Sequence, residues 1–198
     1  MDQEQIGRLV KQALETGKWM LRRSNDGTSY GGFQWKPVGE WTEAPDWDPM
    51  PCCGGGLHGS APEAWGYFTD YPSLDFCITD GERVSVGDDK IKVPRAMILL
   101  RNALPEGLMV RGSLDLRGTQ VTTLPEELTV GGSLNLSGTQ ITALPEGLTV
   151  GGSLDLSGTQ ITALPEGLTV GGSLYLSGTQ ITALPEGAVV EGKIFWRE

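Results

Sequence analysis

The chain has 198 residues, with 15 Lys or Arg, 25 Asp or Glu and a formal net charge of −10. This balance argues against direct binding to nucleic acid, which needs clustered basic residues to neutralise phosphates. No apolar run approaches the roughly 18 residues of a membrane-spanning helix, and the polar N-terminus does not resemble a secretory signal. Three cysteines are too few for a disulfide framework, so the sequence predicts a cytoplasmic protein with reduced thiols.

Residues 1–100 are predicted to form a small α+β domain, and residues 101–198 a second domain made of repeats. Apolar residues recur at intervals of three and four within 2–21, which predicts an amphipathic helix over that segment, with Gly17 marking its end or a kink. We expect residues 93–102 to lead into the repeats as their N-terminal cap. Between these segments the pattern predicts a short helix at 61–67 and strands at 76–78, 83–86 and 90–96. Segment 33–41 alternates like a short strand that is broken at Pro37.

Residues 51–60 read Pro-Cys-Cys-Gly-Gly-Gly-Leu-His-Gly-Ser and contain the only histidine, His58. Together with Gly32-Phe-x-Trp35, Glu63-Ala64 and the segment 86–96, this motif resembles a domain of unknown function of bacterial and phage proteins. That domain typically carries a Cys-x-x-Gly-Leu/Phe-His motif and is often followed by a repeat array. The resemblance spans about residues 30–97. It implies a bacterial or phage origin and a cytoplasmic location, but it brings no activity.

Two interpretations of the segment around His58 involve no catalysis. In the first, the glycines form a tight loop in which backbone approaches backbone, and His58 is hydrogen-bonded within the fold. In the second, the segment binds zinc, because thiolate and imidazole ligands suit this metal, although the spacing lacks a paired Cys-x2-Cys. The ligands would then be Cys52, Cys53, His58 and Cys77.

In a third interpretation, the segment is an active site. The backbone N–H groups of Gly54, Gly55 and Gly56 would bind a phosphate or an oxyanion, and His58 would orient a ribose or act as a base. A histidine on a strand after glycines is similar to ADP-ribosyltransferase-like folds, so this interpretation implies NAD as the cofactor. The other motifs of that group are not recognisable here. The site would be completed by a partner such as Glu63, Asp75 or Tyr67.

Residues 104–187 repeat a 20-residue unit, and the copy that starts at Leu144 is followed by one in which only Asp155 changes, to Tyr175. A period of this length predicts a solenoid, in which each unit buries its apolar side by stacking on its neighbours. The pattern Leu-x-Leu-x-x-Thr-x-Ile-x-x-Leu-Pro-x-x-Leu-x-Val-x-Gly resembles bacterial leucine-rich repeats of the short Leu-Pro-x-x-Leu type. The resemblance implies a β-rich solenoid of five coils, and Pro165 argues against a helix on its convex side.

The repeats differ from the leucine-rich-repeat pattern at one position, and a separate segment is expected to end the array. The asparagine by which the family ties adjacent coils together is replaced by a threonine, and we expect the hydroxyls to bond coil to coil. These residues are Thr119, Thr139, Thr159 and Thr179. Residues 188–198 are predicted to form a C-terminal cap, in which Phe195 and Trp196 cover the apolar end of the last coil.

The register of each unit predicts which residues face outward. Leu154 and Leu156 point into the core, so the residue between them points out. Aromatic residues are enriched at interface hot spots, which adds weight to the change at position 175. The predicted partner-binding residues are Asp115, Asn135, Asp155, Tyr175 and Arg117. A convex row is expected to keep the protein soluble and comprises Glu106, Glu126, Glu146, Glu166 and Glu186, with Glu127 beside it.

These features together predict a protein-interaction module. Its expected partner is another protein with a basic surface, and no cofactor is needed. The presumed origin suggests a phage- or prophage-encoded inhibitor or adaptor directed at a host protein, such as a component of a defence system. The alternative is an NAD- or nucleotide-directed enzyme centred on His58, with the solenoid as its targeting arm. A third possibility is a structural element of a phage particle that assembles through the solenoid ends.

Overall fold

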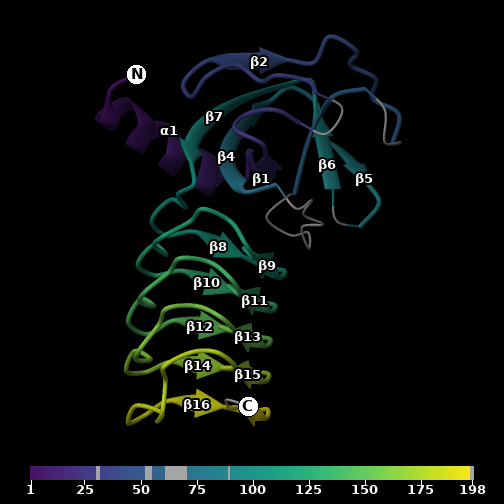
Figure 1. Cartoon of the computed structure of the whole chain (residues 1–198). Helices are drawn as coiled ribbons and strands as arrows, with labels where there is room; N and C mark the ends of the chain where they lie inside the picture. Colours follow the sequence, from purple (N-terminus) through teal and green to yellow (C-terminus); the bar gives the residue numbers. More distant parts are fainter. Residues whose placement is uncertain (30–31, 52–54, 61–70, 89, 197–198) are drawn as a thin grey trace. The chain divides into compact units, whose positions relative to one another are not determined.

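The computed structural model describes residues 1–29, 32–51, 55–60, 71–88 and 90–196. The chain divides into two compact units, Met1–Arg101 and Asn102–Glu198, which we call the N-terminal unit and the repeat unit (Figure 1). The helix predicted at 61–67 lies outside the described residues, as do Tyr67 and the candidate site residues Cys52, Cys53, Gly54 and Glu63.

The N-terminal unit begins with the helix α1 (Gln3–Thr16). The Asp2 carboxylate accepts a 2.8 Å hydrogen bond from the backbone of Gln5, whose side chain accepts one of 3.0 Å from the backbone of Asp2, a reciprocal capping box. Gly17, in the left-handed conformation with φ 68°, ends the helix. An end of the helix at Gly17 is one of the two expected alternatives and is confirmed. The longer span to residue 21 is wrong, because the apolar residues after the glycine are buried in the strand β1 (Trp19–Ser24).

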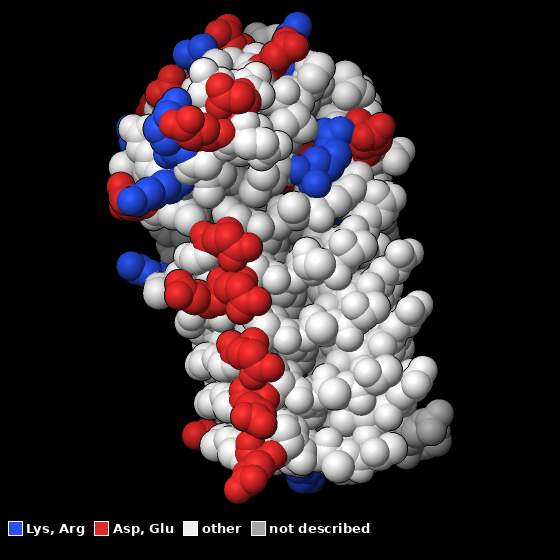
Figure 2. All heavy atoms as spheres, turned by 90° about the vertical axis from the view of Figure 1, so that its left-hand side faces the viewer, with Lys and Arg blue, Asp and Glu red and all other residues white. Residues whose placement is uncertain are grey.

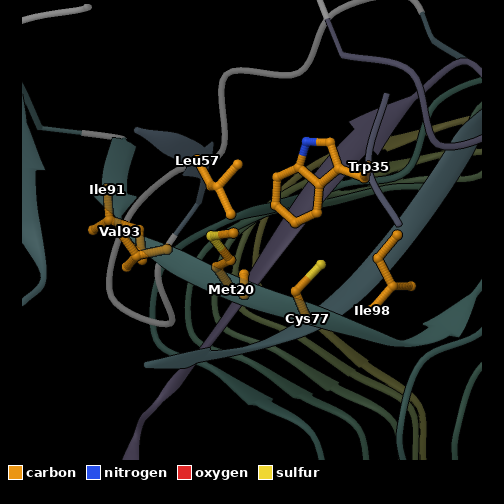
Figure 3. Packing of buried hydrophobic residues seen from close by; sticks show 8 residues of the cluster. Met20, Trp35, Leu57, Cys77, Ile91, Val93 and Ile98 are labelled. Atoms are coloured by element: carbon orange, nitrogen blue, oxygen red, sulfur yellow. The ribbon is translucent and has the colours of Figure 1, made fainter. Parts of the chain in front are cut away.

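Two antiparallel sheets follow the helix in the described part of this unit. The first has the strand order β1-β4-β7-β2, with β2 at Trp41–Glu43, β4 at Ser73–Asp80 and β7 at Arg95–Arg101. The second has the order β3-β6-β5, with β3 at Leu57–Gly59, β5 at Val84–Val86 and β6 at Lys90–Val93. Both sheets contribute to one apolar cluster, which comprises Met20, Trp35, Leu57, Cys77, Ile91, Val93, Ala96 and Ile98 (Figure 3).

Strands are confirmed near 76–78 and 83–86, but the expected extents of two other strands are wrong. Segment 33–41 is not a strand, because Pro37 starts a turn that the backbone N–H of Glu40 closes at 3.1 Å. Segment 90–96 is divided at Pro94, which has no N–H to continue a ladder. Residues 95–101 form β7, which pairs with β4 on one side and β2 on the other, so this part of the segment expected to lead into the repeats is a sheet strand of the N-terminal unit.

A buried carboxylate lies on the first sheet. Asp75 in β4 is fully buried and accepts hydrogen bonds from the Ser24 hydroxyl at 2.9 Å and from the Arg101 Nε at 2.8 Å. Arg22, also buried, places its Nη1 atom 3.4 Å from the same carboxylate, and its guanidinium lies over the Trp35 ring at 3.9 Å. Burial lowers the pKa of Arg22, against the opposing effect of Asp75. The carboxylate therefore compensates two arginines at once.

The repeat unit is a β-solenoid of two parallel five-stranded sheets, in which each residue pairs with the one 20 positions later (Figure 1). The first sheet contains β8 (Met109–Val110), β10 (Thr129–Val130), β12 (Thr149–Val150), β14 (Thr169–Val170) and β16 (Val189–Val190). The second contains β9 (Leu114–Asp115), β11 (Leu134–Asn135), β13 (Leu154–Asp155), β15 (Leu174–Tyr175) and β17 (Ile194–Phe195). The chain completes about four turns, and the truncated fifth copy adds the last strand to each sheet.

The interior of the solenoid follows the predicted register. Leu154, Leu156, Ile161, Leu168 and Val170 have no exposed surface, and their equivalents one coil earlier are buried in the same way. The segment that carries Pro165 has no regular secondary structure, as expected for the convex side. The prediction of a β-rich solenoid with a 20-residue period is therefore confirmed.

The hydroxyl that joins neighbouring coils is not the predicted one. The threonine hydroxyls donate within their own coil, for example from Thr159 to the carbonyl oxygen of Leu156 at 2.7 Å, so the expected coil-to-coil threonine ladder is wrong. Serines make the ladder instead. The Ser133 hydroxyl accepts the backbone N–H of Ser153 at 3.0 Å, and the same bond joins Ser153 to Ser173. Each of these serines is half-buried between two coils.

The predicted C-terminal cap also differs from the structure. Residues 189–190 and 194–195 continue both sheets in register instead of folding across the end of the last coil. Phe195 and Trp196 are 41% and 40% exposed, so neither is buried over the end of the coil as expected. Phe195 pairs with Tyr175 in the sheet, which directs its ring outward with the other side chains at this position.

Candidate interaction surface and the His58 loop

The predicted contact residues line up on the outside of the second sheet. Parallel pairing places each of them beside its equivalent in the next coil, and strands in such a sheet lie about 4.8 Å apart. Sequence reasoning missed the last member, Phe195, although its 20-residue distance from Tyr175 was the available signal. We call this column the outer strand face, and it comprises Asp115, Asn135, Asp155, Tyr175 and Phe195.

The polar members of this face also stabilise their own coils. The Oδ1 atoms of Asp115, Asn135 and Asp155 each accept the backbone N–H of the residue two positions later, at 3.0, 3.0 and 2.9 Å. Such a bond fixes the turn that follows the strand. Tyr175 has no equivalent acceptor, so its change from the repeat sequence gives up this bond.

Tyr175 and Phe195 form an aromatic pair on the surface. Their ring centroids lie 4.7 Å apart and the ring planes are inclined by 3°, so the two rings stack face to face. Tyr175 remains 36% exposed. Stacked aromatic rings with exposed surface are rigid and apolar, and such groups contribute strongly to protein interfaces.

Arg117, the remaining predicted contact residue, is engaged within the chain. Its Nε and Nη2 atoms donate to both carboxylate oxygens of Asp115, at distances of 2.6 to 3.0 Å. The Asp115 side chain is only 11% exposed, whereas that of Arg117 is 61% exposed. The first coil therefore presents a neutralised acid–base pair and not a free carboxylate.

A row of glutamates runs along another side of the repeat unit. Figure 2 shows it as a red line with largely uncharged surface beside it. All members of the row are exposed, in agreement with the prediction, and they are Glu106, Glu126, Glu127, Glu146, Glu166 and Glu186. Residues 101–198 contain ten acidic and five basic residues, so this row carries most of the negative charge of the repeat unit.

His58 lies in β3, where it is half-buried and pairs with Lys92 of β6. Burial, together with the positive charges of Lys92 and Lys90, holds the pKa of His58 below its usual value of 6.5. The imidazole is therefore neutral near pH 7. A neutral imidazole has one donor and one acceptor nitrogen, which suits a structural hydrogen bond as well as a base.

The glycines before His58 allow close contacts with the chain at 46–48. A Cβ added at Gly55 would meet the backbone oxygen of Asp46, and one at Gly56 would lie 3.1 Å from the Trp47 ring. The backbone N–H of Gly56 donates to the Asp46 carboxylate at 3.3 Å. An anion at this position would compete with that carboxylate. These contacts favour the first interpretation of the segment, in which Gly55 and Gly56 are structural.

Cys77 lies apart from His58. Its side chain is completely buried in the apolar cluster with Leu57, and burial raises the pKa of its thiol. Because side chains alternate along a strand, His58 points to the opposite face of β3 from Leu57. The structure therefore does not bring Cys77 and His58 together as zinc ligands. Across the described ranges, no group of three or more His, Cys, Asp or Glu side chains is placed to hold a metal ion.

Comparisons with known proteins do not assign the chain to a family. No protein-family model, no curated protein and no solved structure matches it. The resemblance of residues 30–97 to a bacterial and phage domain therefore stays a prediction. Among the helices that the structure describes, none is long and apolar enough to cross a membrane.

Proposed function

We propose that this protein is a binding module that recognises another protein through the outer strand face of its repeat unit. The observation that carries the proposal is the aromatic pair of Tyr175 and Phe195, which is exposed on an otherwise polar column. Tyr175 is the only difference between two adjacent 20-residue copies. At this position, the carboxylate of Asp155 accepts a backbone hydrogen bond that stabilises the turn, and the Tyr175 ring cannot. Selection for a contact with another molecule would produce such a change.

The charge of the protein supports a basic partner. The net charge is −10, and the glutamate row adds a continuous negative stripe to the repeat unit. Charge of one sign speeds the encounter with a partner of the other sign, and this effect weakens as salt is added. The resemblance of residues 30–97 points to a bacterial cell as the place to look for that partner. An inhibitor or adaptor directed at a host defence protein is the narrower form of the proposal.

The alternative of an NAD- or nucleotide-directed enzyme receives less support. It requires backbone N–H groups free to receive an anion, but Gly56 donates to Asp46 and Gly55 packs against the same residue. The neutral His58 remains compatible with a base. We therefore place the function in the repeat unit and not in the His58 loop.

The proposal is tested by affinity capture from bacterial lysate with three forms of the intact chain. Wild type is compared with Tyr175→Asp, which restores the residue of the preceding copy and so preserves the coil. The control is Thr162→Ala, an exposed position outside the outer strand face. We expect a stoichiometric partner to be retained by wild type and by the control but lost from Tyr175→Asp. Equal retention by all three forms would show that the outer strand face is not the binding surface.

A further inference from the structure

Two aspartates at the same position of the repeat differ in how they are compensated. In the first coil, Asp115 is held by Arg117 through both carboxylate oxygens. In the third coil, Asp155 is followed at the corresponding position by Ser157, whose backbone N–H donates to Oδ1 at 2.9 Å. No Lys or Arg of the described residues pairs with Asp155. The third coil thus has the same carboxylate as the first without its arginine.

The aromatic ring of Tyr175 lies next to this carboxylate in the column. Parallel pairing places Asp155 and Phe195 on opposite sides of Tyr175 in the column. Because Phe195 stacks on one face of the Tyr175 ring with only 3° between the planes, the other face is turned toward Asp155. A tyrosine side chain is longer than an aspartate, so the outer part of this face extends beyond the carboxylate. The carboxylate and the open ring face therefore lie side by side on the outer strand face.

This combination of a carboxylate and a ring face suits a guanidinium group. The N-terminal unit twice stacks an arginine on an indole, with Arg22 at 3.9 Å from the Trp35 ring and Arg95 at 4.4 Å from the Trp41 ring. A planar guanidinium both stacks on a ring and donates two parallel hydrogen bonds to a carboxylate, whereas an ammonium group does neither as well. The Arg117–Asp115 pair shows the second of these contacts on the outer strand face itself.

We propose that Asp155, Ser157 and Tyr175 form a binding site for an arginine side chain of the protein partner. This inference rests on the proposed function and names the chemistry of its contact. The guanidinium lies on the face of Tyr175 that Phe195 leaves open and pairs with the Asp155 carboxylate. The partner supplies to the third coil the arginine that Arg117 supplies to the first.

The site is tested in the intact protein with two probes of equal charge, N-acetyl-arginine amide and N-acetyl-lysine amide. Binding is followed by NMR through the ring signals of Tyr175, which are assigned by their loss in Tyr175→Asp. We expect saturable shifts with the arginine probe and affinity for the lysine probe lower by about fivefold, because the ammonium group keeps the ion pair but loses the stacked, two-pronged contact of the guanidinium. Equal affinity for both probes would reduce the site to non-specific attraction and overturn the proposal.

A matched pair of substitutions separates specific binding at Asp155 and Tyr175 from the effect of the overall charge. Ser157→Arg places beside Asp155 the arginine that the first coil has, and it should weaken the arginine probe by about fivefold or more. Ser137→Arg makes the same charge change one coil earlier, beside Asn135 and away from the aromatic pair, and should leave binding unchanged. An equal effect of the two substitutions, or none, contradicts the site.

The two proposals fail in different ways. Loss of the cellular partner from Tyr175→Asp, combined with no preference for the arginine probe, would leave the outer strand face as the binding surface and reject the arginine site. Specific binding of the arginine probe, combined with partner capture that Tyr175→Asp does not alter, would reject the proposed function and leave Asp155 and Tyr175 as an arginine site.

Discussion

The hydroxyl of Ser133 accepts the backbone N–H of Ser153 at 3.0 Å, and the side chain that makes this bond belongs to the preceding coil. The series begins at Ser113, whose hydroxyl accepts the backbone N–H of Ser133. It ends at Lys193, whose backbone N–H donates to the Ser173 hydroxyl but whose side chain has no hydroxyl to continue the series. At this position between the two sheets, the backbone N–H thus bonds to a serine hydroxyl of the preceding coil instead of to a backbone carbonyl oxygen. Neighbouring coils are joined at this corner by an acceptor that a single substitution removes.

Ser153→Ala should therefore weaken the contact between the third and fourth coils. The half-buried N–H of Ser173 loses its acceptor, and we expect the free energy of unfolding to fall by about 1 kcal/mol. Urea unfolding followed by circular dichroism measures the change, and faster hydrogen exchange at the Ser173 amide places it at this corner. Ser177→Ala is the control, because that hydroxyl is exposed and makes no hydrogen bond with the described residues. Equal loss in both variants would argue against the serine ladder.

Close packing of the coils predicts different costs at two glycines. A Cβ at Gly152 would lie 2.6 Å from the Ser133 Oγ and 2.8 Å from its backbone nitrogen, so Gly152→Ala must separate two coils. Gly147 has a φ of 66° but no atom within 4 Å of the added Cβ. We expect Gly147→Ala to cost about 1 kcal/mol from backbone strain and Gly152→Ala at least about 2 kcal/mol from overpacking. Thermal unfolding of both variants tests the order, and a larger loss at Gly147 would contradict the coil spacing described above.

Much of the repeat unit is predictable from the sequence because one physical rule decides it. The period-2 spacing of Leu154 and Leu156 and the exact 20-residue period set which side chains point inward, and this determines the register of every coil. The choice between Thr159 and Ser153 as the coil-to-coil bond is different. Both residues carry a hydroxyl, and only the backbone path of the coil decides which carbonyl or N–H lies within reach.

The errors in the N-terminal unit arise from competition between local signals. Residues after Gly17 continue an apolar pattern that suits a helix, but their burial between neighbouring strands stabilises β1 instead. The outward position of Phe195 was available from its spacing to Tyr175, yet an exposed aromatic residue near the end of an array also fits a cap. For the candidate site, the sequence identified the column but not that Arg117 neutralises Asp115, since this depends on side-chain geometry.

The buried carboxylate of the first sheet should be the most sensitive position of the N-terminal unit. Asp75→Asn keeps the shape of the side chain but removes the charge that compensates Arg22 and Arg101, so we expect a loss of about 3–5 kcal/mol. Asp26→Asn is the control, because Asp26 also pairs with Arg101 but its side chain is 89% exposed. We expect this variant to lower the free energy of unfolding by less than about 1 kcal/mol. Urea unfolding by tryptophan fluorescence reports on this unit, which contains five of the six tryptophans. Similar losses in both variants would show that Asp75 does not organise the buried arginines.

The pH dependence of stability should reveal the environment of His58. Its pKa in the folded protein lies below the value of about 6.5 in the unfolded chain, because burial and Lys92 disfavour the imidazolium. As the pH falls through about 6.5, the unfolded chain binds a proton that the folded protein does not, so the free energy of unfolding decreases. The contribution of the neutral His58 to the free energy of unfolding is complete above about pH 6.5 and is lost as the pH falls toward the pKa of His58 in the folded protein. His58→Gln cannot titrate, so its stability should fall less than that of wild type between pH 8 and pH 5.5. As the only histidine, His58 also gives a single imidazole NMR signal, and a midpoint above 6.5 in the folded protein would contradict its burial beside the two lysines.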